Sequence, residues 1–183
     1  MAMFSKNVGP VEIVFNAVSI GLTQGGSKLA VTRDVAVTTA DKTGKTSRAK
    51  IVTGHGVKVT GAITEATLVQ LAAVIGGSVT EGATTDELKI KAQVGKDLLS
   101  EAKILILKPI VEGVTSTDEE DWITIPKATI NPAFDVPFEL ENQKVWGFEF
   151  EGHPLTADDV ASGATYDGGD WAENDLLRLG KAD

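Results

Sequence analysis

The chain has 183 residues, 42% of them hydrophobic, and a formal net charge of −9. This length allows one globular domain with a sizeable core. Because the chain has no cysteine, disulfides, cysteine zinc sites and thiol nucleophiles are excluded. The acidic balance argues against nucleic-acid binding, since such affinity comes mostly from Lys and Arg.

No stretch approaches the roughly 20 apolar residues that a membrane helix needs. The first residues also lack the apolar segment of a signal peptide. We therefore expect a protein that is made and kept in a cytoplasm.

The charges are distributed unevenly along the chain. Residues 27–60 carry seven basic and two acidic side chains, a net charge of +5. Residues 112–175 carry sixteen acidic and two basic side chains, a net charge of −14. Such segregation is found on ordinary solvated surfaces and also on complementary faces that meet in self-assembly.

In chain order, residues 11–22 cluster β-forming side chains and predict a strand that ends before Gly25 and Gly26. Two segments rich in Val, Thr and Ala then flank the polar turn DKTG, residues 41–44. This pattern predicts a long β-hairpin over about 28–60.

The turn of this hairpin contains Gly44, Lys45 and Thr46, which match the end of a phosphate-binding loop motif. That motif needs a glycine where this chain has Thr39, and it needs a following helix whose N–H groups face the phosphates. Residues 47–61 instead repeat Val, Ile, Thr and Gly in a strand-like pattern. The sequence therefore favours a hairpin over a nucleotide site.

One amphipathic helix is predicted over about 64–75. Apolar residues recur there at spacings i, i+3, i+4 and i+7, with Thr64 as the expected N-cap. Gly76 and Gly77 supply the C-terminal stop. No second helix is predicted.

Strand patterns resume after the helix in four segments, residues 87–94, 103–111, 122–130 and 138–152. The last is expected to form two strands around an ENQK turn. In its second half, Trp and Phe alternate with other residues, so an aromatic face is predicted to oppose a face that carries Glu149 and Glu151. The predicted fold is mainly β: one domain over 1–183, an antiparallel β-sandwich or barrel with one α-helix.

The two ends of the chain are predicted to be extended. Residues 1–10 form an expected N-terminal arm. Residues 153–183, which are rich in Gly and Asp and show little periodicity, form an expected C-terminal arm. This second arm is predicted to be either a flexible extension or a segment that orders against a neighbouring subunit.

The sequence shows no catalytic constellation. His55 and His153 are about a hundred positions apart, with no cysteine to complete a zinc site, and no serine lies in a G-x-S-x-G motif. The acidic run at residues 118–121 lacks the spacing and the glycine of an EF-hand, which favours a solvated loop over a calcium site. We expect no enzymatic activity, no cofactor and no metal.

The order of the predicted elements resembles that of the tail tube proteins of long-tailed bacteriophages, also called major tail proteins. Three stretches, which together span most of the chain, carry the resemblance: GPVEIVFN at 9–16, VKVTGAITEATLVQLAAVIGG at 57–77, and the strand pair within 123–152, from ITIPKATINPAF to FELENQKVWGFEFEG. None of them holds an invariant chemical residue, so the resemblance lies in the architecture.

This resemblance implies a β-sandwich that assembles into rings, typically hexameric, whose inner sheets form one continuous β-barrel. The rings would stack head to tail into the tube through which DNA leaves the capsid. The expected location is the virion tail, with the host cytoplasm during assembly. The expected partners are further copies of the chain and the tape measure, terminator and baseplate or tip proteins. DNA would be present only in transit, without sequence-specific binding, and no membrane would be involved.

The resemblance also assigns roles to residues. A long hairpin between early strands contacts the adjacent ring in this family, and the corresponding residues are Arg33, Lys42, Gly44, Lys45, Arg48 and Lys50. Their expected acidic complement is Asp118, Glu119, Glu120 and Asp121. Glu149 and Glu151 are candidates for carboxylates that line the lumen, where like charges let DNA slide. The helix would lie outside the inner barrel.

Two alternatives belong to other classes. A phage decoration, baseplate or tail-terminator protein would share the acidic, β-rich composition without stacking on itself. A carbohydrate-binding or other ligand-binding β-sandwich would need a concave aromatic cluster. The large candidates for such a cluster are Trp122, Trp146 and Trp171, although packing roles suit them better.

Overall fold

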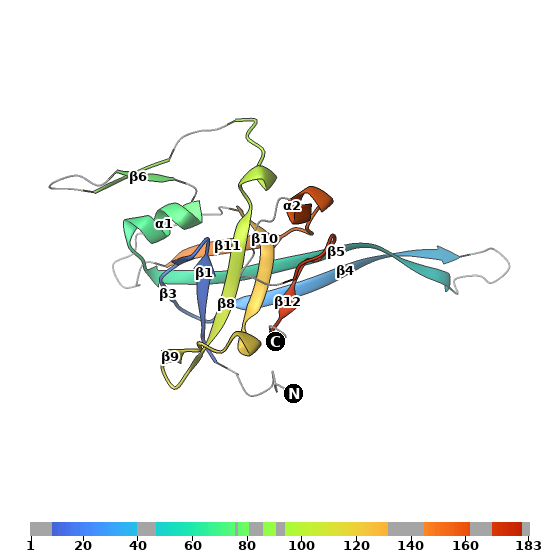
Figure 1. Cartoon of the computed structure of the whole chain (residues 1–183), viewed down its shortest axis with the longest axis horizontal. Helices are drawn as coiled ribbons and strands as arrows, with labels where there is room; N and C mark the ends of the chain where they lie inside the picture. Colours follow the sequence, from blue (N-terminus) through green and yellow to red (C-terminus); the bar gives the residue numbers. More distant parts are fainter. Residues whose placement is uncertain are drawn as a thin grey trace.

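The computed structural model describes residues 9–39, 47–75, 77–80, 86–90, 94–131, 145–161 and 170–180. Its main feature is one large antiparallel sheet, which confirms the predicted mainly-β class (Figure 1). The strands of the main path, in spatial order, are β2 (Val18–Ser19), β1 (Val11–Phe15), β8 (Lys103–Val111), β10 (Ile123–Asn131), β11 (Trp146–Gly152), β5 (Ser47–Glu65) and β3 (Leu22–Thr23).

Three further strands pair beside this path: β4 (Lys28–Thr39) with β5, β9 (Val114–Thr115) with β8, and β12 (Arg178–Leu179) with β10. The short strands β6 (Ser78–Thr80) and β7 (Glu87–Lys89) form a separate hairpin. The predicted strands at 103–111 and 122–130 are thus confirmed as β8 and β10. The strand predicted over 87–94 is shorter, because β7 ends at Lys89.

The sheet curls so that its two ends meet. β2 lies at one end of the strand order and β3 at the other, yet only Ile20 and Gly21 separate them in the chain. Ile20 is fully buried. Gly21 has a φ of 102°, and a Cβ atom there would collide with the carbonyl oxygen of Glu65, so glycine permits the close approach. We call this junction the seam.

The core fills the inside of the curled sheet. Side chains alternate along each strand, and the inward set is apolar, as the period of two predicts. The fully or nearly fully buried members include Ile13, Phe15, Val57, Val59, Leu105, Leu107, Ile125, Phe148 and Phe150. The ring of Phe150 lies 5.0 Å from that of Phe15 and 5.6 Å from that of Phe148, centroid to centroid. The predicted aromatic face of β11 is therefore the core face.

The helix begins later than predicted. α1 covers Leu68–Ile75, whereas Thr64 and Glu65 belong to β5, where pairing with β3 holds them extended. The N-cap is Thr67. Its hydroxyl accepts the N–H of Gln70 at 3.3 Å, and the Gln70 side chain accepts the N–H of Thr67 at 2.7 Å. These reciprocal bonds form a capping box. The prediction of Thr64 as the N-cap was therefore wrong.

The C-terminal stretch differs from the predicted arm, because its described part packs on the chain's own sheet. It contains a second helix that was not predicted, α2 (Ala157–Ala161). Leu155 is buried and exchanges backbone hydrogen bonds with Asn174 and Asp175, and β12 extends the sheet beside β10. Residues 1–8 of the expected N-terminal arm and the expected ENQK turn lie outside the described residues.

Candidate assembly surfaces

The predicted hairpin is present as a long ribbon of β4 and β5, paired from Lys28 opposite Thr60 to Thr39 opposite Ser47. Among the described residues, β11 pairs with β5 only over residues 57–63 of β5, so the segment of β5 before Val57 pairs there with β4 alone. Figure 1 shows this distal ribbon extending away from the body of the sheet. Strands on both sides of the turn argue against the phosphate-binding loop, which needs a helix after it.

One face of the distal ribbon carries an apolar strip. Val31 lies opposite the buried Val57, and Val35 lies opposite Val52, so these side chains continue the core face of β5 beyond the body. Val37 follows two residues later on the same face. We call Val31, Val35, Val37 and Val52 the valine strip. Between 43% and 57% of each of these residues is exposed, which is unusual for β-branched residues on a core face.

Basic residues lie on the same face as the valine strip. Arg33 lies between Val31 and Val35 in β4, and Lys50 lies opposite Val37. Both are exposed, and neither forms an ion pair within the described part of the chain. The other predicted ribbon residues, Lys42, Gly44 and Lys45 and the side chain of Arg48, lie outside what the structure describes.

A bulge lies within the ribbon. Asp34 pairs with Gly54 and Val35 with Val52, so β5 carries one extra residue, Thr53. Gly54 follows the extra residue, and glycines within strands often mark bulges and close approaches. Bulges increase strand twist, so this one re-aims the distal ribbon relative to the body.

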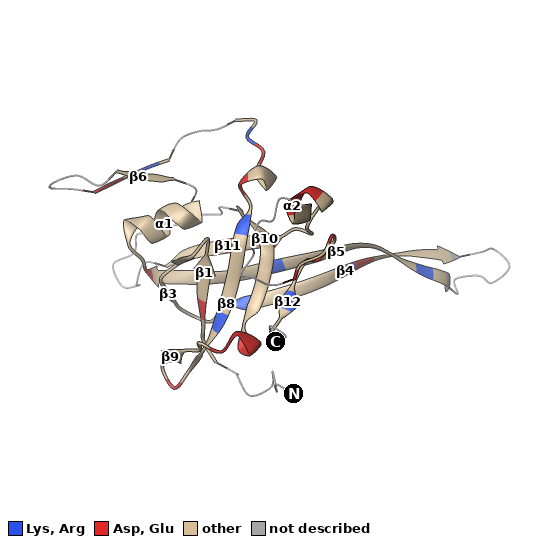
Figure 2. Ribbon diagram, viewed as in Figure 1, with Lys and Arg blue, Asp and Glu red and all other residues tan. Residues whose placement is uncertain are grey.

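The predicted acidic complement forms one compact turn. Asp118 precedes a single 3-10 turn, Glu119–Asp121, and its carboxylate accepts the N–H of Glu120 at 3.1 Å. Figure 2 shows this acidic turn on the body beside the start of β10, while the ribbon extends elsewhere. No ion pair joins the turn to Arg33 or Lys50 among the described residues. Within one chain, the described members of the predicted basic set, Arg33 and Lys50, therefore form no ion pair with the acidic turn.

The predicted lumen carboxylates, Glu149 and Glu151, lie on the outer face of β11, and both have a lysine beside them. Lys58 Nζ lies 3.0 Å from Glu149 Oε1, and the Asn131 amide donates to the same oxygen at 3.4 Å. Lys58 lies directly opposite Glu151 in the pairing of β11 with β5. The hydrogen bond and the charge of Lys58 lower the pKa of Glu149, and the same contacts raise the pKa of Lys58. This face is thus a polar surface of mixed charge.

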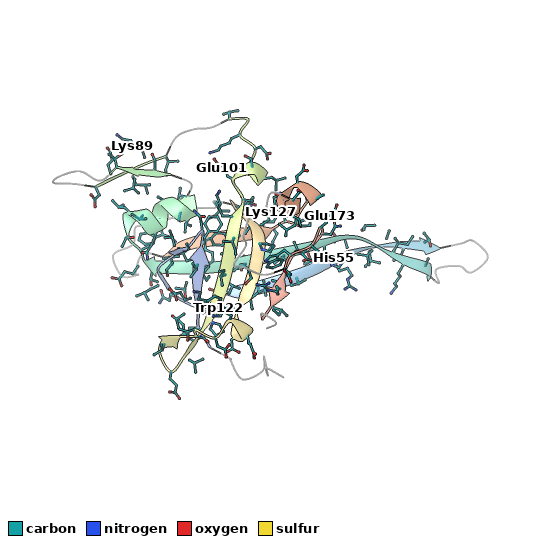
Figure 3. All side chains as sticks on the ribbon, in the orientation of Figure 1. His55, Lys89, Glu101, Trp122, Lys127 and Glu173 are labelled. Atoms are coloured by element: carbon teal, nitrogen blue, oxygen red, sulfur yellow. The ribbon has the colours of Figure 1, made fainter. Side chains whose placement is uncertain are left out.

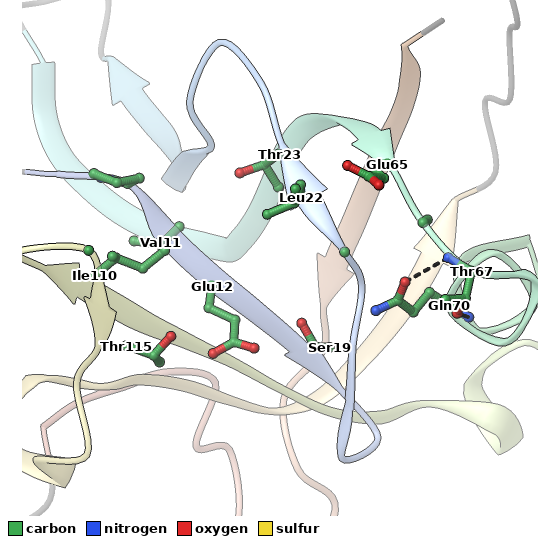
Figure 4. A pocket seen from close by; sticks show the side chains of 14 residues that line it. Val11, Glu12, Ser19, Leu22, Thr23, Glu65, Thr67, Gln70, Ile110 and Thr115 are labelled. Atoms are coloured by element: carbon green, nitrogen blue, oxygen red, sulfur yellow. Dashed lines mark hydrogen bonds between the residues drawn. The ribbon is translucent and has the colours of Figure 1, made fainter.

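A hollow of about 740 Å³ opens at the seam (Figure 4). We call it the seam hollow. Its walls come from four separate segments: β1, the β2–β3 region, the end of β5 with the start of α1, and the β8–β9 turn. The residues used below are Val11, Leu22 and Ile110, which are apolar, and Glu12 and Glu65, which are acidic.

The seam hollow exists because the seam closes only in part. β2 pairs with Val14 and Phe15, and Ile13 accepts one more bond from the Ile20 N–H at 3.0 Å. On this side of β1, Val11 has no partner strand in the described part of the chain. Neither Glu12 nor Glu65 has an ion pair among the described residues. Sequence reasoning did not find this hollow.

The tryptophans do not form one aromatic cluster. Trp122 donates its ring N–H to the Ser116 carbonyl at 3.0 Å, and the Lys108 ammonium lies 4.0 Å from its ring centroid. Trp146 begins β11 and packs partly buried against the core. Trp171 is covered by the guanidinium of Arg178 at 4.5 Å. These contacts agree with packing roles for the tryptophans.

The two histidines make different contacts. His55 lies on β5, opposite Arg33 of β4 (Figure 3). His153 contacts the Thr129 hydroxyl at 2.8 Å. Within the described residues, no group of three or more His, Cys, Asp or Glu side chains could hold a metal ion. In that same part of the chain, neither helix has the length and apolar character needed to cross a membrane.

The comparisons with known proteins give little. No protein family and no curated protein matches the chain. Among solved structures, the chain is similar to one described as "Virion of native gene transfer agent (GTA) particle", with 10% sequence identity and a TM-score of 0.43. The similarity covers 84% of this chain and 96% of that chain.

Proposed function

We propose that this protein is a structural subunit that assembles with copies of itself, and that its assembly is the tail tube of a bacteriophage-type virion. One observation carries the first part: the ribbon extends the core face of the sheet beyond the body and leaves the valine strip in water. The second part rests on the resemblance of the sequence to tail tube proteins.

The ribbon is a poor structure for an isolated monomer. A two-stranded hairpin is at best marginally stable in water, and exposed valines gain free energy only when they are covered. β4 pairs with β5 alone, so its outer edge has no partner strand in the described part of the chain. Natural proteins usually shorten or blunt such edges. A partner that pairs with this edge or covers the strip removes both costs.

A second copy of the chain is the proposed partner. Edge pairing between subunits would close a ring, and the ribbon, with its basic residues from Arg33 to Lys50, would set the register between stacked rings. Head-to-tail contacts of this kind generate rings or open filaments. In this proposal the protein performs no chemistry and needs no cofactor. DNA passes through the tube, and the face with Glu149 and Glu151 remains the candidate lumen surface.

The valine strip provides a direct test. We expect Val35→Ser combined with Val52→Ser to leave the monomer folded and to abolish assembly, because the strip loses its apolar contact area. Ile51→Ser is the matched control: Ile51 lies opposite Ala36, on the other face of the same ribbon, and 57% of it is exposed. Sedimentation velocity over a concentration series measures assembly, and circular dichroism checks the fold.

Two results would contradict the proposal. A wild-type chain that remains monomeric at every concentration, with no rings or filaments in negative stain, removes self-assembly. A doubly substituted strip that assembles like the wild type shows that the strip is not an assembly surface. Loss of assembly in the Ile51→Ser control alone would place the contact on the opposite face.

A further inference from the structure

We propose that the seam hollow is the acceptor for the distal ribbon of a second copy of this chain. The inference rests on the proposed self-assembly and adds the surface that receives the ribbon. The acidic turn at residues 118–121, expected from the sequence, is the competing acceptor.

The two surfaces match in chemistry. The ribbon presents valines interleaved with Arg33 and Lys50 on one face. The seam hollow presents Val11, Leu22 and Ile110 together with the carboxylates of Glu12 and Glu65. Figure 4 shows these two carboxylates on different walls of the hollow, one on β1 and one at the end of β5. The acidic turn offers charge, but its three helical positions are all acidic and supply no apolar surface for the strip.

The backbone also matches. The side of β1 that faces away from β8 is unpaired at Val11 in the described chain, and the ribbon has a free edge along β4. An incoming strand can therefore add main-chain hydrogen bonds at the seam while its valines contact the apolar wall. The acidic turn is a single 3-10 turn that caps itself through Asp118 and offers no strand edge.

The placement of the two surfaces requires a second copy. β5 runs from the distal ribbon, where Lys50 lies, to the seam, where Glu65 lines the hollow. Fifteen residues separate these two positions in one extended strand, roughly 50 Å at about 3.3 Å per residue. A chain cannot place its own ribbon in its own hollow. Donor and acceptor at opposite ends make a heterologous contact, which propagates from copy to copy.

Reciprocal charge reversal tests the pairing. The donor variant is Arg33→Glu with Lys50→Glu, and the acceptor variant is Glu12→Lys with Glu65→Lys. For each, we expect the concentration at half-assembly, from sedimentation velocity, to rise at least about tenfold, because like charges would meet across the interface. The four substitutions combined in one chain should restore assembly to within a few-fold of the wild type.

Mixing the two variants gives a second readout. The intact ribbon of the acceptor variant can enter the intact hollow of the donor variant, and the reversed ribbon of the donor variant can enter the reversed hollow of the acceptor variant. We therefore expect an equimolar mixture to co-assemble into chains in which the two variants alternate, although neither variant assembles alone. The matched control is Glu119→Lys with Glu120→Lys, which makes the same charge change on the acidic turn and should assemble within about threefold of the wild type.

The outcomes separate this inference from the proposed function. An acceptor variant that assembles normally beside a failing donor variant overturns the hollow as acceptor and leaves self-assembly standing. A control that fails as severely as the acceptor variant also overturns it, because the effect is then general charge. A wild type that never assembles overturns both proposals. Glu12 lies opposite Lys108, so Glu12→Lys would place two like charges together. Glu12→Gln with Glu65→Gln is therefore a second acceptor variant, for use if the lysine substitutions unfold the chain. Normal assembly of that variant in low salt overturns the proposal.

Discussion

Gly61 has no side chain, and a core side chain occupies the space that this leaves. It lies directly opposite Phe148 in the pairing of β5 with β11, and the Phe148 ring occupies the space above it. A Cβ atom at Gly61 would lie 2.5 Å from Phe148 Cζ and 3.0 Å from Ser27 Oγ. Gly61 therefore allows an aromatic ring to pack on the backbone of the strand.

We therefore expect Gly61→Ala to lower the free energy of unfolding by about 1–3 kcal/mol, because the ring must shift within a packed core. Gly54→Ala in the same strand is the matched control, since its nearest heavy atom, Asp34 Oδ2, lies 3.4 Å from the added carbon. Urea unfolding followed by tryptophan fluorescence compares the two. Equal stability of both variants would show that Phe148 does not constrain position 61.

For single residues, prediction from the sequence succeeded where the alternation of side chains along a strand is enough to assign each residue to a face. The sequence placed Phe148 and Phe150 on one face of β11 and Glu149 on the other, and burial confirms this division. It missed the contact between Glu149 and Lys58, which are 91 positions apart. Strand alternation gives the face of each lysine and glutamate, but it does not say which strands are neighbours.

At the scale of elements, the strands were easier to predict than the helices. The long ribbon and the apolar strand β8 carry strong patterns, and both are present. The start of α1 was wrong because pairing with β3 keeps Thr64 in a strand, which helix propensity does not anticipate. α2 has only five residues and no apolar period, so its position depends on tertiary contacts.

Those contacts attach α2 to the sheet. Lys127 Nζ on β10 lies 2.7 Å from Asp159 Oδ2, and the same oxygen accepts the N–H and the hydroxyl of Thr156. The hydrogen bond from Lys127, together with those from Thr156, lowers the pKa of Asp159 to about 2. A lowered pKa stabilises the folded state above the ordinary pKa, near 3.8, and this contribution is lost as the pH falls toward 2.

We expect Asp159→Asn to lower the free energy of unfolding by about 1–2 kcal/mol at neutral pH, given the partial exposure of the pair. The stability of the variant should also fall less than that of the wild type between pH 4 and pH 2. Asp158→Asn is the control, because Asp158 is exposed in the same turn. Urea titrations at several pH values measure both effects. Identical pH profiles for the wild type and Asp159→Asn would disprove the role of this ion pair.

At the scale of the whole molecule, the sequence indicated one of the two proposed assembly surfaces. The ribbon is contiguous in sequence, so its basic charge and its strand pattern could be recognised together. The seam hollow draws on four separate segments and exists only because the ends of the sheet meet at Gly21. No local pattern records that closure. The packing of the described C-terminal residues could not be read from a local pattern for the same reason, since burial of Leu155 depends on the folded sheet.

Self-assembly is the central claim, and electron microscopy of the purified wild-type chain tests it most directly. The protein is concentrated, incubated and imaged in negative stain, and its solution mass is measured on the same sample. The account predicts rings or hollow tubes with a regular axial repeat, and a mass that rises with concentration. A monodisperse monomer at every concentration, with no rings or tubes in the images, would contradict it.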